Sequence, residues 1–192
     1  MMLHRHQRFG NNKLKPISLI ENKLLNDLQS DIEYLQYEAE SLYHVIEFVP
    51  YSEKPLDGAS ITEIFLNIDS IQVSITDVIK DLTLEGSNLD ISEYHIFENI
   101  ELSKAELVNY SIESVISSIK ENRVNLIKEI SSKESVFYEI EIKENDTIIT
   151  IFELLKTMIK QERALLRKIA ELVMTYQSDR QFQRQLKSSS RD

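Results

Sequence analysis

The sequence predicts an all-α protein, a four-helix bundle with up-down-down-up topology. Gly and Pro are scarce in its 192 residues, with three of each and none beyond Gly86, whereas β-rich folds need these residues at many turns. Apolar residues recur at helical spacing in four long segments. Two Ser-x-x-Glu capping boxes, at Ser60–Glu63 and Ser103–Glu106, mark expected helix starts.

The first helix is expected from about Pro16 to Val49, because its apolar residues recur every seven positions, as in Leu28, Leu35 and Leu42. Pro50 ends it, since the residue before a proline is pushed out of the helical region. After a turn-rich link at 51–59, the second helix is expected from the Ser60 box to about Leu84. Gly86 then serves as its C-terminal cap.

The second half begins with a crossover connection at about 86–103, which is expected to hold a short helix around 92–99. The third helix is expected from Ser103, with an apolar stripe from Val108 to Ile130. Residues 136–142 alternate with a period of two, which predicts a short strand used as a loop excursion or as an edge for a partner. Asp146 or Thr147 is expected to cap a fourth helix that carries Ile148 and ends near Tyr176.

The charge is unevenly distributed, which divides the chain into a basic N-terminus (1–15), the bundle (16–177) and a basic tail (178–192). The two ends carry +4 and +2, which leaves −16 for the bundle from a total of −10. Such an acidic body repels phosphate backbones, so nucleic-acid binding is not expected. The basic ends either contact an acidic partner or a neighbouring subunit, or are simply solvated.

The sequence lacks the residues that several kinds of active or binding site require. The chain has no Cys, which removes disulfides, thiolate zinc sites and cysteine nucleophiles. It has no Gly-rich phosphate loop, no Gly-x-Ser-x-Gly elbow and no Glu-x-x-His pair for a di-iron site. No apolar run approaches the ~18 residues of a membrane span, and no secretory signal opens the sequence. A cytoplasmic protein without a cofactor or a membrane partner is therefore expected.

The order of segments resembles the DinB/YfiT-like family of four-helix bundles, which are described as metalloenzymes. The resemblance covers roughly residues 17–177. It is carried by the end of the first helix, the start of the second and two stretches of the last, namely Phe48–Pro50, Ser60–Asp69, Thr150–Leu155 and Met158–Ile169.

The resemblance implies the fold with its crossover connection, and it places the family's three metal-ligand histidines at Asn67, Gln161 and Leu165. All three histidines are absent here. Leu165 cannot ligate and amide oxygens are poor ligands for zinc or nickel, so no metal is expected at these vestigial binding positions. Asn67 and Gln161 are expected either to bond to each other inside the bundle, directly or through water, or to point outward.

Three functions remain open at this point. The first is a non-catalytic bundle that acts as an interaction or small-ligand-binding protein, expected to be a homodimer because wide apolar stripes often bury surplus surface against a second copy. The second is a transferase- or hydrolase-class enzyme with a relocated carboxylate or Tyr site. The third is a helical adaptor that uses its basic tail.

Overall fold

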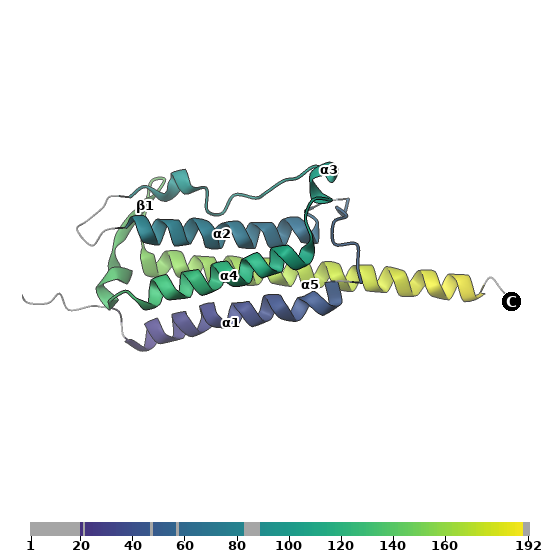
Figure 1. Ribbon diagram of the computed structural model, residues 1–192, viewed down its shortest axis with the longest axis horizontal. Helices are drawn as coiled ribbons and strands as arrows, with labels where there is room; N and C mark the ends of the chain where they lie inside the picture. Colours follow the sequence, from purple (N-terminus) through teal and green to yellow (C-terminus); the bar gives the residue numbers. More distant parts are fainter. Residues whose placement is uncertain (1–19, 21, 47, 57, 83–88, 190–192) are drawn as a thin grey trace, which may run out of the picture.

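Four long helices form the body of the protein in a computed structural model (Figure 1). They are α1 (Asn22–Ile46), α2 (Ile61–Asp81), α4 (Ile112–Ser131) and α5 (Ile151–Ser189). The shorter elements are the 3-10 helices η1 (Ile91–Tyr94) and η2 (Ser135–Glu139), helix α3 (Lys104–Leu107), and strands β1 (Glu141–Glu144) and β2 (Thr147–Thr150). The structure describes residues 20, 22–46, 48–56, 58–82 and 89–189.

The topology is up-down-down-up, as the sequence predicts. α1 and α5 run in one direction, and α2 and α4 run in the other (Figure 1). The segment between η1 and α3 crosses the length of the bundle along the outside of α2, which allows α2 and α4 to run parallel. α1 and α2 each pack against both α4 and α5, so α4 and α5 lie on a diagonal of the four-helix arrangement.

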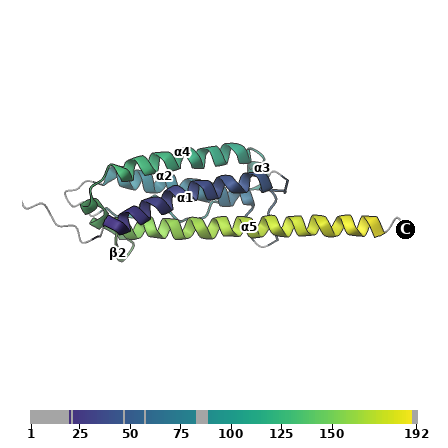
Figure 2. The same ribbon diagram turned by 90° about the horizontal axis from the view of Figure 1, so that it is seen from below.

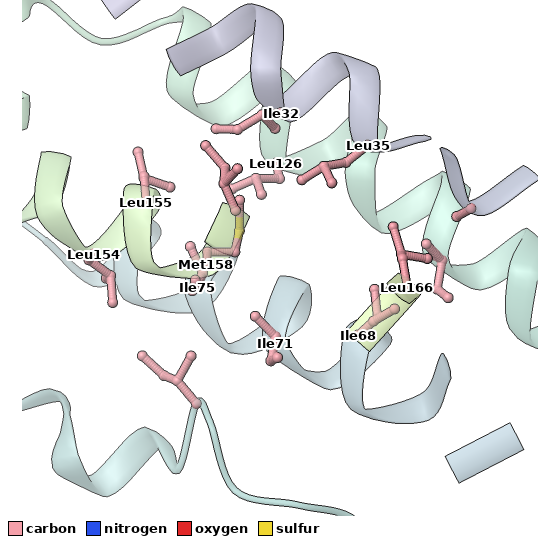
Figure 3. Close-up of a cluster of buried hydrophobic side chains, with 14 of the residues drawn as sticks. Ile32, Leu35, Ile68, Ile71, Ile75, Leu126, Leu154, Leu155, Met158 and Leu166 are labelled. Carbon is pink, nitrogen blue, oxygen red and sulfur yellow. The ribbon is translucent and has the colours of Figure 1, made fainter. Parts of the chain in front are cut away.

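The core is built from branched aliphatic side chains of all four long helices. Figure 3 shows Ile32 and Leu35 of α1 facing Leu126 of α4 and Met158 of α5. These side chains are at most 1% exposed. Full burial of one such side chain stabilises the fold by roughly 1.5–3 kcal/mol, so the four stripes hold the bundle together.

The first capping box is confirmed. Ser60 Oγ accepts a hydrogen bond from the Glu63 N–H at 3.2 Å, and Glu63 Oε2 accepts one from the Ser60 N–H at 2.8 Å. The helix that it starts ends at Asp81, slightly before the expected Leu84, which lies outside the described residues together with Gly86. The expected start of the first helix at Pro16 also lies outside them.

The prediction of a single third helix is wrong, because this segment forms two helices, α3 and α4. The Ser103–Glu106 box is present, but it starts only the single turn of α3. Ser111 then accepts a hydrogen bond from the Ser114 N–H and caps α4. Val108, assigned from the sequence to the buried stripe, lies between the two helices and is 76% exposed. A second Ser N-cap therefore overrides the apolar periodicity.

The strand region also differs from the prediction. Residues 135–139 form η2 rather than strand, and β1 pairs with β2 as an antiparallel hairpin. Asn145 adopts φ 54° in the two-residue turn, a left-handed conformation that Asn tolerates well and that suits tight hairpins. Thr147 therefore belongs to β2 and caps no helix, and Ile148 is 66% exposed.

The last helix starts later and ends later than expected. Thr150 and Glu153 form a third capping box, with the Thr150 hydroxyl accepting from the Glu153 N–H at 3.2 Å. α5 then runs for 39 residues, and its C-terminal part extends beyond the other helices (Figure 2). Part of the predicted basic tail is thus helical. None of the described helices is long and apolar enough to cross a membrane.

Candidate functional site

Asn67 fastens the crossover segment to the outside of α2. Its Oδ1 accepts the backbone N–H of Ile100 at 2.6 Å, and the side chain is 4% exposed. One turn earlier, Glu63 Oε1 accepts the N–H of Leu102 at 2.8 Å and forms an ion pair with Lys54 Nζ at 2.7 Å. The two residues lie four positions apart on one face of α2, and this face holds the crossover in place.

The other two positions that the family resemblance assigned to metal ligands have different surroundings. The side chain of Gln161 is exposed, and Leu165 is half-buried against the core. The expected Asn67–Gln161 hydrogen bond is not among those that the structure describes; the Asn67 oxygen accepts from the Ile100 N–H instead. Leu165 offers no lone pair, Gln161 faces solvent and the Asn67 oxygen is engaged, so these residues do not fit a divalent metal.

The rest of the described chain offers no metal site either, because no three His, Cys, Asp or Glu side chains are grouped there to hold a metal ion.

Polar groups are nevertheless present inside the bundle. Gln72 of α2, Arg123 of α4 and Glu162 of α5 are at most 1% exposed, and an Arg123 Nη2–H donates to Glu162 Oε2. Burial raises the pKa of the Glu162 carboxyl, and the guanidinium opposes this rise.

A hollow on the surface lies elsewhere, along the seam between α1 and α5. This α1–α5 groove has a volume of about 540 Å³. Its lining residues are spaced so that they share one face of each helix. Those from α1 are Leu24, Asp27, Leu28 and Asp31, and those from α5 are Phe152, Lys156, Ile159, Lys160, Arg163, Ala164 and Arg167.

The groove combines an apolar floor with charged walls. Leu28 and Ile159 are buried at its base, with Phe152 half-buried beside them. One ion pair joins the two helices across the groove, with Arg163 Nη2 lying 2.8 Å from Asp31 Oδ1. Both partners are partly exposed, so the pair contributes on the order of 1 kcal/mol or less to stability.

A second, smaller groove of about 310 Å³ lies where the α1–α2 link meets the C-terminal part of α5. It is lined by Phe48, Val49 and Pro50 on one side and by α5 residues from Tyr176 to Arg184 on the other. Arg180 Nη1 donates to the Phe48 carbonyl at 3.3 Å and partly closes it. The α1–α5 groove is therefore the better candidate for a binding site.

The predictions from the sequence include neither the groove nor the buried polar cluster. The signal for the groove is the spacing of four cations, Lys156, Lys160, Arg163 and Arg167, which places them on one face of a helix. The signal for the cluster is a charge inside an apolar stripe, as at Arg123 between Ile119 and Leu126. Neither signal indicates which helix packs opposite, so the two sites can be located only once the fold is known.

Comparison with known proteins supports the fold alone. No protein-family model matches this chain, and no curated protein matches it. A solved structure of YfiT from Bacillus subtilis, described as a probable metal-dependent hydrolase with an unusual four-helix bundle topology, superposes with a TM-score of 0.62. The match covers 84% of this chain and 93% of that one at 11% identity. The fold expected from the DinB/YfiT-like resemblance is thereby confirmed.

Proposed function

We propose that this protein is a non-catalytic, small-ligand-binding bundle whose site is the α1–α5 groove. The observation that carries the proposal is the groove itself, whose volume of about 540 Å³ falls within the roughly 300–1,000 Å³ of small-molecule pockets. Its apolar floor at Leu28 and Ile159 offers burial to the hydrocarbon part of a ligand, and its walls offer charge.

The chemistry of the lining favours binding over catalysis. The groove has no hydroxyl, thiol or imidazole among its lining side chains, so Ser, Thr and Cys nucleophiles and a His general base have no place in it. Of its two carboxylates, Asp31 is paired with Arg163. The YfiT comparison describes a probable metal-dependent hydrolase, but the residues at the corresponding expected ligand positions do not fit a metal.

Titration with the neutral fluorescent dye Nile red tests the proposal, because this dye reports an apolar site without regard to charge. Saturable binding at one site per chain is expected. Ala164→Trp, which fills the groove from α5, should remove that binding. Ala105→Trp on the exposed helix α3 is the matched control and should leave it unchanged.

Two outcomes would overturn the proposal. The first is the lack of saturable dye binding by the native protein. The second is equal binding by the native protein and the Ala164→Trp variant, with circular dichroism showing that the variant is folded. Catalytic turnover that requires a stoichiometric metal would instead favour an enzyme.

A further inference from the structure

We infer that the ligand of the α1–α5 groove is an amphipathic anion, a small molecule with an apolar body and a carboxylate-, sulfonate- or phosphate-type head. The inference rests on the proposed function and specifies its ligand class. It is carried by the charges that line the groove and by their pairing.

The groove is positive within an acidic protein. Four cations and two carboxylates line it, which gives a local charge of +2, whereas the whole chain carries −10. The net charge of the groove is therefore opposite in sign to that of the whole molecule. A positive hollow with low-dielectric walls raises the local concentration of anions.

The pairing of these charges leaves cations available at the walls. Asp31 neutralises Arg163. The ion pairs that the structure describes do not involve the other three cations of the groove, Lys156, Lys160 and Arg167, against which only Asp27 remains. All three of these cations are exposed, so their charged ends can reach a ligand head without being desolvated first.

The apolar floor of the groove lies next to one of these cations. The Lys156 ammonium lies 5.5 Å from the centre of the Phe152 ring, so a cation already borders the apolar floor. Long Lys and Arg side chains cover apolar surface with their stems and keep their charges at the edge. A ligand whose tail rests on Leu28 and Ile159 would thus place its head among the cations of α5.

Three ligands with the same tail and different heads test this inference: decanoate, decanol and decyltrimethylammonium, each below its micelle concentration and measured by isothermal titration calorimetry. Decanoate should bind at least about ten-fold more tightly than decyltrimethylammonium, since the exposed cations attract the anionic head and repel the cationic one. Decanol should lie between them. Raising the salt concentration should weaken decanoate binding most, because salt screens exposed charges.

The triple variant Lys156→Gln, Lys160→Gln and Arg167→Gln should lower the affinity for decanoate about ten-fold and leave that for decanol nearly unchanged. Lys104→Gln, Lys128→Gln and Lys168→Gln remove the same charge from exposed positions outside the groove and serve as the control. Equal affinity for the cationic and anionic ligands, or an equal loss of affinity in both triple variants, would overturn the ligand class alone. Binding of none of the three ligands would overturn the proposed function as well.

Discussion

Arg123 of α4 and Glu162 of α5 form an ion pair across the interior of the bundle, and each side chain is only 1% exposed. The two helices lie on a diagonal, so the pair spans the centre of the core rather than a seam between neighbours. Two other polar atoms of this cluster, Arg123 Nε and Nη1, have no hydrogen-bond partner among the described residues. The pair is therefore a costly element of the core, held in place by the surrounding apolar packing.

Removing one partner of this pair should be far more damaging than removing both. Arg123→Met leaves the Glu162 carboxylate buried without its counter-charge and should lower the free energy of unfolding by about 3–5 kcal/mol. Adding Glu162→Leu should recover most of this loss or exceed the native stability. Urea unfolding of the native protein and both variants measures the difference.

Lys120 supplies the control for this experiment, because its ion pair with Glu40 lies on the surface. Lys120→Met should change the free energy of unfolding far less than Arg123→Met does. A double variant as unstable as Arg123→Met alone would show that the buried pair contributes net stability, contrary to this account.

The Asn67 side chain should matter for the crossover segment and not for a metal. Asn67→Ala leaves the Ile100 N–H without its acceptor, which should cost about 1–3 kcal/mol and speed hydrogen exchange at that amide. Gln161→Ala, at an exposed position, should stay within about 0.5 kcal/mol of the native protein. Loss of a bound divalent metal in the Asn67→Ala variant would contradict the structural role.

The pH dependence of the free energy of unfolding should reveal the stabilising contribution of the Glu63 carboxylate. Burial raises the pKa of its carboxyl, but the Leu102 N–H, the Lys54 ammonium and the Ser60 donors together outweigh this effect and hold the pKa below its ordinary value of 4.5. A lowered pKa in the folded state means that the stabilisation is present above about pH 4.5 and is lost as the pH falls through the folded-state value.

Urea unfolding at a series of pH values tests this prediction. The native protein should be more stable than Glu63→Gln at pH 7, and the difference should shrink steadily below about pH 4.5. Glu106 belongs to the exposed capping box of α3, so Glu106→Gln should show a smaller difference at pH 7. A difference between native protein and Glu63→Gln that grows on acidification would refute the assigned pKa direction.

The homodimer expected from the sequence stays a prediction, and the C-terminal part of α5 is the surface to test. Met174 and Phe182 are 67% and 58% exposed there, and this part of the helix extends beyond the bundle (Figure 2). If a second copy covers this surface, sedimentation equilibrium should give twice the chain mass, and Phe182→Ser should weaken the association. A native protein that sediments as a monomer at all concentrations would rule out the dimer.

The elements that could be predicted from sequence are those specified by local chemistry. Ser60 and Glu63 satisfy each other's backbone groups within one turn, so their box reads directly as a helix start. Thr150 and Glu153 carry the same signal, but Ile148 continues the helical spacing upstream and conceals it. The left-handed turn at Asn145 depends on pairing between strands, which single-segment periodicity does not contain.

The candidate site could not be predicted from the sequence for a different reason. Asp31 and Arg163 meet although 132 residues separate them, and only the packing of α1 on α5 brings the basic face of α5 beside Leu28. Likewise, the resemblance to the DinB/YfiT-like family correctly predicted the fold but directed attention to Gln161, whose side chain faces solvent. The neighbouring residue, Glu162, is the one that faces the interior.

Binding of the ligand in the α1–α5 groove is tested most directly by a two-dimensional ¹H–¹⁵N NMR titration of the labelled protein with decanoate. The largest chemical-shift changes are expected at the amides of Leu28, Ile159 and Ala164, which line that groove. Changes concentrated at Phe48 and Tyr176 in the second groove, or no saturable change at any amide, would contradict it.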